Sequence, residues 1–357
     1  MIKRSSAFKL RAGAALVCAV FLSIGPQARS AEYVAGVRQM TAPTEERDHA
    51  LSVTVWYPAA QGGEKTMLGD NIFFEGTAAM KDAPIQDGEF PLILLSHGAG
   101  LAGSADAMSW IATPLAEEGF IVAAPTHPGN TGRNRSAAET MKLWLRPSDI
   151  SNTLDAVEVD PSLRAHVKSG QTGLLGLSMG GNTALLVAGA RLDSALYASY
   201  CDTDDLNASL CEWVRLSGVD LGAADAQTVT RDNTDGRVGF VLAIDPAPAD
   251  IFAQQGFSNI SIPVALVNLG ERSEIPATVQ ASGIADAIPG STYQVIEKAS
   301  HASMFAECKP GAAEIAVEEG IEDPICTDGG GESRQLIHTQ LIEMVTAAFD
   351  AALRPEK

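Results

Sequence analysis

The chain alternates between short apolar runs and longer segments whose apolar residues recur at helical spacing. Short continuous apolar runs are typical of strands that are buried on both faces. On this basis the sequence predicts strands at 33–40, 51–58, 91–98, 120–125, 171–178, 237–244, 262–269 and 291–297. The helical spacing predicts helices at 104–118, 146–159, 182–192 and 333–353, the first with Ser104 as its N-cap.

The order of these elements predicts an α/β fold. Strands that alternate with helices form a mostly parallel central sheet with helices on both faces. No linker-like stretch divides the strand series, so we expect a single domain over residues 31–357. The segment 59–89 is rich in Gly, Asp and Lys, which predicts a loop. Two polar segments, 193–235 and 302–332, are predicted insertions near the carboxyl ends of the strands.

The first 30 residues have the layout of a secretory signal peptide. Basic residues precede the apolar run AGAALVCAVFLSI, and the small residues Ala28 and Ser30 stand before a cleavage point at Ala31. The run has 13 residues, whereas a helix needs about 20 to span a bilayer. An uncleaved anchor is the alternative. We expect a periplasmic or secreted protein without a membrane span.

Charge and cysteine content narrow the class of partner and cofactor. The chain has 44 acidic and 25 basic residues, a net charge of −19, which disfavours nucleic acid and anionic membrane surfaces as partners. Four cysteines remain after cleavage, and in an oxidising compartment they predict the disulfides Cys201–Cys211 and Cys308–Cys326. A zinc site is a weaker alternative because paired CxxC spacing is missing. The sequence calls for no metal or cofactor, and it leaves the oligomeric state open.

The segment GLSMGG places Ser178 between Gly176 and Gly180, where a predicted strand passes into a predicted helix. A nucleophile elbow has this form: the serine sits on a strained turn, and glycines two residues away allow close approach of the chain. The positive end of the following helix then lies where an oxyanion would form. The alternative is a tight turn without chemistry.

A serine nucleophile needs a base and an acid. His301, in EKASHASMF, follows the last predicted strand, and the chain order Ser, acid, His requires such a late histidine. Asp245 directly follows the strand 237–244 and is the predicted acid, although Asp before proline is also a common turn former. Glu271, after the next strand, is the other candidate.

Two backbone N–H groups are predicted to form an oxyanion hole, those of Met179 and Ala99. Ala99 lies in the loop after strand 91–98, where His97 could brace the chain, and His127 could line the pocket. The residues considered for an apolar acyl pocket are Trp110, Trp144, Met304 and Phe305.

Together these segments resemble the α/β-hydrolase superfamily, and within it the exported dienelactone-hydrolase-like proteins of the platelet-activating-factor acetylhydrolase type. The resemblance covers about residues 33–353 and is carried by LSHGAG, APTHPGN, RPSDISNTLDAV, GLSMGG and HASMF with the later Cys and His. In the acetylhydrolase type the acid ends the strand after the elbow helix, which matches Asp245. Dienelactone hydrolases use a cysteine nucleophile, whereas this chain has Ser178.

The residues and the resemblance predict a serine hydrolase of small carboxylic esters, with short acyl chains, acting through an acyl-enzyme. An amidase or peptidase of the same fold is one alternative. A non-catalytic binding protein on a hydrolase scaffold is another, because fold alone does not fix function.

Overall fold

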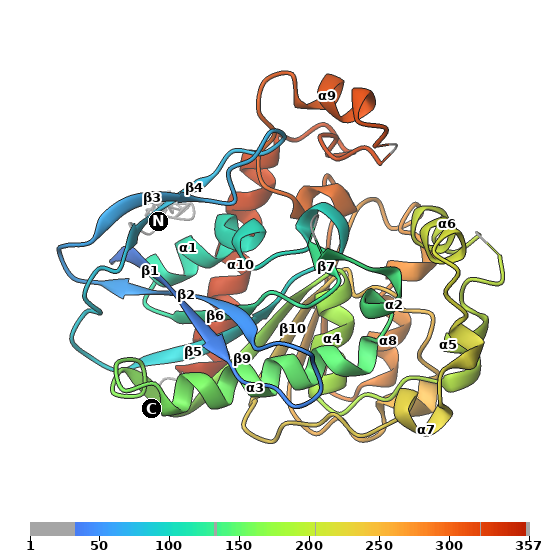
Figure 1. Ribbon diagram of the computed structural model, residues 1–357, viewed down its shortest axis with the longest axis horizontal. Helices are drawn as coiled ribbons and strands as arrows, with labels where there is room; N and C mark the ends of the chain where they lie inside the picture. The colour runs from blue at the N-terminus through green and yellow to red at the C-terminus, as the bar shows by residue number, and fades with distance from the viewer. Residues whose placement is uncertain (1–32, 132–133, 204, 322, 355–357) are drawn as a thin grey trace, which may run out of the picture. The chain divides into compact units, whose positions relative to one another are not determined.

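A ten-stranded sheet forms the centre of the computed structural model, which describes residues 33–131, 134–203, 205–321 and 323–354 (Figure 1). The strand order is β12-β11-β10-β9-β5-β6-β2-β1-β4-β3. The strands are β1 (Val34–Ala42), β2 (Leu51–Ala59), β3 (Glu64–Leu68), β4 (Thr77–Lys81), β5 (Phe90–Ser96), β6 (Ile121–Pro125), β9 (Val167–Leu177), β10 (Phe240–Ile244), β11 (Val264–Leu269) and β12 (Thr292–Ile296), with β7 (Asn130–Thr131) and β8 (Asn134–Arg135) forming a separate small ribbon.

The six strands from β12 to β6 run parallel to one another, and β2 and β1 continue the sheet antiparallel. Every residue of β5, β6 and β10 is buried. Strands covered on both faces need apolar residues on both, which explains why these strands read as unbroken apolar runs. The mostly parallel sheet predicted from the sequence is confirmed.

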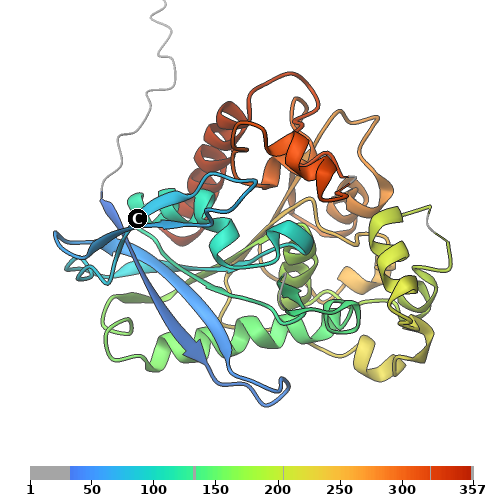
Figure 2. The same cartoon turned by 45° about the horizontal axis from the view of Figure 1, so that its top comes forward.

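Helices cover both faces of the sheet (Figure 2). Two separate apolar cores lie between these helices and the sheet. One core contains Leu115 of α1 and Leu341 and Phe349 of α10. The other contains Leu154 of α3 and Leu185 of α4. The helices are α1 (Ser109–Glu117), α2 (Ala137–Thr140), α3 (Arg146–Val159), α4 (Met179–Val187), α5 (Ser194–Ser199), α6 (Ala208–Leu216), α7 (Ala226–Val229), α8 (Ser282–Ala287), α9 (Ala312–Glu318) and α10 (Arg334–Leu353).

The prediction of a loop over 59–89 is wrong, because this segment contains the hairpin β3–β4. The two strands pair antiparallel, and β4 adds to the sheet beside β1 through Gly36 and Val37. Along β3 no residue is buried, and on β4 only Ala79 is. Solvent-exposed strands of this kind are held by backbone pairing, so they lack the apolar pattern that reveals buried strands.

Two helix starts also differ from the prediction. Ser104 does not cap α1, because the N-cap of α1 is Met108. The hydroxyl of Ser104 instead accepts a hydrogen bond from Ala107 N at 3.3 Å. The helix predicted at 182–192 begins earlier, at Met179, and ends at Val187. Glycines are poor helix formers, so the sequence pattern placed the Gly pair after Ser178 outside the helix. Tertiary packing overrides this preference.

Both predicted disulfides are present, Cys201–Cys211 and Cys308–Cys326. The first lies in the 193–235 insertion, which contains α5, α6 and α7. The second joins the two sides of the 302–332 insertion, which contains α9.

Among the described residues no helix is long and apolar enough to cross a membrane. The predicted signal peptide, residues 1–30, lies outside the described residues, so the start of the mature chain at Ala31 stays a prediction.

Candidate active site

Ser178 occupies a strained turn between β9 and α4. Its φ is 54° and its ψ −121°, a backbone conformation that L-residues rarely adopt. Its N–H donates to Ile244 O at 2.9 Å, and its carbonyl accepts from Ala247 N at 3.0 Å, so the end of β10 holds the turn on both sides.

The glycines around Ser178 are required by close packing of the backbone. A Cβ on Gly176 would lie 2.1 Å from Gly180 O, and one on Gly180 would lie 1.8 Å from Ser96 O. Both distances are impossible for real atoms, so neither position accepts a side chain without movement of the turn. The spacing G-x-S-x-G therefore follows from how tightly the two glycines pack against each other and Gly180 packs against β5.

Asp245 directly follows the neighbouring strand β10 and is completely buried. Like Ser178 it has positive φ, 43°. Its Oδ1 accepts hydrogen bonds from Leu269 N at 2.9 Å and from Asn268 Nδ2 at 2.7 Å. These donors fix the carboxylate and leave Oδ2 turned to His301.

The structure brings Ser178, His301 and Asp245 into one hydrogen-bonded line. His301 Nε2 lies 3.1 Å from Ser178 Oγ, and His301 Nδ1 lies 2.9 Å from Asp245 Oδ2. The His301 side chain is 41% exposed, so the line can be reached from solvent. Glu271, the alternative acid, is exposed on the surface, and the acid in contact with His301 is Asp245.

His301 stands on a short 3₁₀ turn, His301–Met304, that has its own supports. Ser300 and Ser303 form a reciprocal capping box. The two carbonyls that end the turn, those of Ser303 and Phe305, lie 2.9 and 3.1 Å from His338 Nε2. Burial lowers the pKa of His338 to about 4, so this imidazole is neutral and donates from Nε2. His338 thus supports the turn through these two carbonyls.

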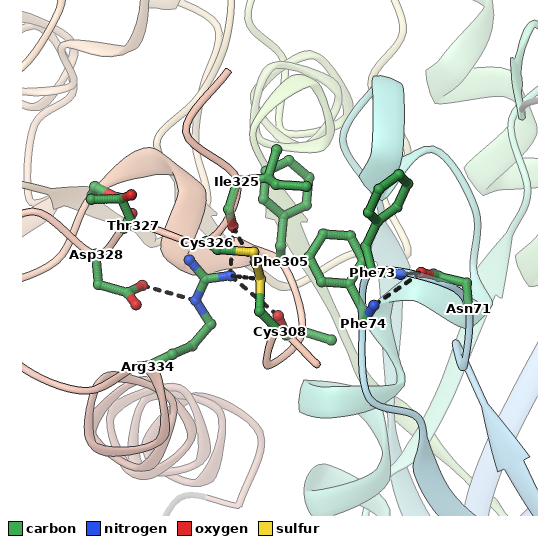
Figure 3. Close-up of a disulfide and its surroundings, with 12 residues drawn as sticks. Asn71, Phe73, Phe74, Phe305, Cys308, Ile325, Cys326, Thr327, Asp328 and Arg334 are labelled. Atoms are coloured by element: carbon green, nitrogen blue, oxygen red, sulfur yellow. Dashed lines mark hydrogen bonds and ion pairs between the residues drawn. A yellow bond between two sulfur atoms is a disulfide. The ribbon is translucent and has the colours of Figure 1, made fainter. Parts of the chain in front are cut away.

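The second disulfide, Cys308–Cys326, lies beside Asp328 and Arg334 (Figure 3). Beside Cys326, Asp328 accepts from Ser303 Oγ at 2.9 Å and from Arg334 Nε at 2.8 Å. Arg334 Nη1 also donates to Ile325 O at 2.8 Å. The 302–332 insertion therefore holds the position of His301.

Two aromatic rings connect this insertion to the N-terminal hairpin. Phe305, next to the His301 turn, stacks on Phe74 with ring centroids 5.4 Å apart (Figure 3). Backbone bonds run from Glu75 N to Glu307 O and from Lys309 N to Phe73 O, both at 2.8 Å. The hairpin that sequence reasoning missed thus packs against the segment that carries the histidine.

Trp110 and Met304, considered for an acyl pocket, are core residues with 5% and 3% exposure. The indole of Trp110 stacks on His338 with centroids 3.9 Å apart and donates to Met304 O at 3.0 Å. Trp144 packs edge-on against Tyr197. These contacts give the two tryptophans packing roles.

The two predicted oxyanion donors flank the serine. Met179 is the first residue of α4, and Ala99 follows Gly98, whose Cα lies so close that a Cβ there would be 3.2 Å from Ser178 Cβ. Within the part of the chain that the structure describes, neither N–H has a hydrogen-bond acceptor. Two unpaired backbone N–H groups that lie beside a nucleophile can bind an anion.

Behind this loop lies a second Ser–His–Asp line that sequence reasoning did not find. His127 Nε2 lies 2.9 Å from Ser96 Oγ, and His127 Nδ1 lies 2.8 Å from Asp149 Oδ2. All three residues are 0% exposed. His127 therefore does not line a pocket, contrary to the expectation from the sequence. Burial lowers the pKa of His127 well below the usual value, which keeps the imidazole neutral. Without solvent access this line cannot act on a substrate.

Two arginines surround this buried line. Arg47 donates to both oxygens of Asp149, at 3.0 and 2.7 Å. Arg146 is also buried and donates to Thr183 Oγ1 at 3.0 Å and to the carbonyl of His97. The only sequence signal for the set was that its members fall in LSHGAG, APTHPGN and RPSDIS, which carry the family resemblance.

In the described ranges no three His, Cys, Asp or Glu side chains lie close enough together to hold a metal ion.

Residues 43–152 match the family described as platelet-activating factor acetylhydrolase, isoform II. The match contains Ala99 and the buried Ser96–His127–Asp149 line and ends before Ser178. No curated protein sequence matches the chain.

Two solved structures share the fold. A ferulic acid esterase from Streptomyces cinnamoneus is similar at 18% identity and a TM-score of 0.60, covering 92% of each chain. A dienelactone hydrolase from Anabaena variabilis is similar at 14% identity and a TM-score of 0.50, covering 90% of this chain and all of the other. The family match and the fold together support a hydrolase. The chain has the α/β-hydrolase fold, and over residues 43–152 it is similar to the platelet-activating factor acetylhydrolases.

Proposed function

We propose that this protein is a serine esterase that cleaves small carboxylic esters of short acyl chains through an acyl-enzyme. The observation that carries the proposal is the line Ser178–His301–Asp245, with separations of 3.1 and 2.9 Å, open to solvent at His301. A serine hydroxyl is a poor nucleophile unless a positioned base removes its proton, and these distances are those of such a base.

Each residue has one role in the proposed reaction. Ser178 Oγ attacks the carbonyl carbon of the ester while His301 Nε2 takes the hydroxyl proton. The carbonyl oxygen becomes an oxyanion, which accepts hydrogen bonds from Met179 N–H and Ala99 N–H. The carbon–oxygen bond to the alcohol then breaks, and His301 returns the proton to the leaving oxygen. A water activated by His301 hydrolyses the acyl-enzyme by the same steps.

Asp245 acts on His301 rather than on the substrate. Its Oδ2 accepts from Nδ1–H of the imidazole, which leaves Nε2 unprotonated and aimed at Ser178. After Ser178 has lost its proton, the buried carboxylate stabilises the imidazolium. Because Asn268 and Leu269 hold the other oxygen, the carboxylate cannot turn away.

The proposal is tested by hydrolysis of p-nitrophenyl acetate with the wild type, Ser178→Ala and Ser162→Ala. Ser162 is an exposed serine and serves as the matched control. We expect Ser178→Ala to lower kcat by at least about 10³-fold and Ser162→Ala to leave it unchanged. Equal rates for wild type and Ser178→Ala would remove the catalytic role and favour a binding protein.

A panel of synthetic substrates tests the proposed substrate class. The preference for short acyl groups comes from the resemblance, and p-nitrophenyl esters from acetate to palmitate test it: kcat/KM should fall as the chain lengthens. Matching p-nitroanilides test for an amidase, which would cleave them at comparable rates.

We also propose that the protein is exported to the periplasm or secreted. The support is the layout of residues 1–30 together with the two disulfides, which persist in oxidising compartments. Mass measurement of the protein recovered after expression with its own N-terminus tests the cleavage before Ala31.

A further inference from the structure

The loop between β5 and Ala99 contains a side chain whose hydrogen bonds the proposed chemistry does not yet use. His97 is 0% exposed, although Ala99 is half-buried and Gly100 is exposed in the same loop. Its Nδ1 lies 2.7 Å from the carbonyl oxygen of Gly98. Its Nε2 accepts a hydrogen bond from the backbone N–H of His127 at 3.0 Å.

These two contacts determine the tautomer of His97. A backbone N–H can only donate, so Nε2 must be the unprotonated nitrogen. In a neutral imidazole the proton is then on Nδ1, which donates to Gly98 O. Complete burial lowers the pKa of His97 well below its usual value, and the nearby Arg146 lowers it further, so the ring stays neutral. The backbone of His127 thus fixes which way His97 donates.

The carbonyl that His97 holds belongs to the peptide group that carries the N–H of Ala99. A trans peptide is planar, and its C=O and N–H point in opposite directions. Holding Gly98 O on one side therefore aims Ala99 N–H to the other. A hydrogen bond to the carbonyl also polarises the peptide and strengthens its N–H as a donor.

The Gly98–Ala99 peptide needs this restraint because the loop contains Gly98 and Gly100, and Gly100 has a φ of +65°. Glycines give the backbone freedom to rotate this peptide, and rotation would turn the donor away from Ser178. Arg146 restrains the preceding peptide through the carbonyl of His97. Arg146 is in turn anchored to Thr183 of α4, the helix that begins at the other oxyanion donor.

We propose that His97 is a positioning residue for the oxyanion hole: its Nδ1–H fixes the Gly98–Ala99 peptide so that Ala99 N–H faces the oxygen that becomes charged during the reaction. This inference rests on the proposed esterase function. His97 contacts no substrate atom and takes part in no proton transfer. Its effect is confined to the transition state, because only there does the carbonyl oxygen carry the charge that the donor stabilises.

Two substitutions separate the two hydrogen bonds of His97. The side-chain nitrogen of Asn is at the same branch position as Nδ1, so His97→Asn keeps a donor for Gly98 O and loses the acceptor for His127 N. The amide of Gln reaches the position of Nε2, so His97→Gln keeps the acceptor and loses the donor. Each variant loses one buried hydrogen bond, which makes them matched controls for stability.

We expect kcat to fall in His97→Gln and to be largely kept in His97→Asn. For p-nitrophenyl acetate, His97→Gln should lower kcat by about 10²–10³-fold with KM changed by less than about threefold. His97→Asn should keep kcat within about tenfold of the wild type. Inhibition by phenylboronic acid, which forms a tetrahedral adduct with the serine, should weaken in His97→Gln and not in His97→Asn.

A merely structural role would give a different pattern. It predicts that both variants lower the melting temperature and change kcat alike, and that result overturns the proposal. So does a His97→Gln enzyme with kcat near the wild-type value. Should His97→Gln fail to fold, His97→Asn decides alone: retained kcat supports the proposal, and a loss beyond about tenfold overturns it.

Failure of this inference is distinguishable from failure of the proposed function. If Ser178→Ala abolishes activity while the two His97 variants behave alike, the esterase stands and His97 is only structural. If Ser178→Ala is as active as the wild type, the esterase itself falls, and the inference with it.

Discussion

His301 Nε2 lies 3.1 Å from Ser178 Oγ although 123 positions separate the two residues in the chain. Their meeting depends on two neighbouring strand ends and on an insertion that returns to the same edge of the sheet. The serine follows β9, the acid follows β10, and the histidine follows β12. Because these strands are parallel, their carboxyl ends share one edge, where ligands of open α/β sheets bind.

Asp245→Asn should lower kcat by about 10³–10⁴-fold, because the amide cannot hold the same tautomer of His301 or stabilise its charged form. Glu271→Gln is the matched control and should leave kcat near the wild-type value, since Glu271 is exposed and the acid at His301 is Asp245. Steady-state kinetics with p-nitrophenyl acetate measures both. The reverse pattern would transfer the acid role to Glu271.

The two disulfides should differ in their effect on turnover. Replacing Cys308 and Cys326 by serine should lower both stability and kcat, because this bridge braces the segment that holds the His301 turn. Replacing Cys201 and Cys211 should lower stability alone. Each loss is worth about 2–5 kcal/mol of unfolding free energy.

Urea unfolding and kinetics of the two double variants test the difference between the disulfides. The prediction fails if both pairs change kcat equally, or if the Cys308/Cys326 variant retains wild-type turnover below its melting range.

Gly180→Ala should destabilise the fold by about 1–3 kcal/mol or more, because the new methyl would meet Ser96 O. Gly283→Ala, in α8, meets no atom within 4 Å and should be neutral or stabilising, since alanine favours helix. Urea midpoints of the two variants give the comparison. Equal stability of the two variants would mean that the elbow is packed less tightly than described.

Stability should fall as the pH drops below about 6.5, the pKa of an unperturbed histidine. Burial lowers the pKa of His97, His127 and His338, the last to about 4. Their folded-state pKa values lie below the unfolded value, so the unfolded chain binds more protons. The stability they contribute is complete above pH 6.5 and is lost as the pH falls toward 4.

The size of this effect is at most about 1.4 kcal/mol per pH unit for each imidazole. Urea unfolding between pH 4 and 7.5 measures it. His338→Gln keeps a side-chain donor near the His301 turn and should reduce the slope by one proton. A free energy of unfolding that does not change between pH 5 and 7 would contradict the buried, neutral histidines.

The sequence was most informative where one local pattern has one physical cause. Buried strands such as β5 and β6 need apolar residues on both faces, and the elbow needs glycines at 176 and 180, so both could be predicted. The hairpin β3–β4 could not be predicted, because strands exposed to solvent leave no apolar pattern.

The buried Ser96–His127–Asp149 line could not be predicted for a different reason. Its members come from three separate segments, and each looks like an ordinary polar residue in its own stretch. Only the tertiary structure shows that they meet beneath the loop of Ala99. The role of His338 could not be predicted either. The sequence around a histidine in a helix does not show whether its side chain lies at the surface or bonds two carbonyls.

The most direct test of Ser178 as the nucleophile is labelling with a fluorophosphonate probe followed by peptide mapping by mass spectrometry. The reagent bonds covalently to an activated serine, so the account predicts one label per chain, located on Ser178, with esterase activity lost in proportion. Activity that persists in fully labelled protein, or a label on another serine with Ser178 unmodified, would contradict it.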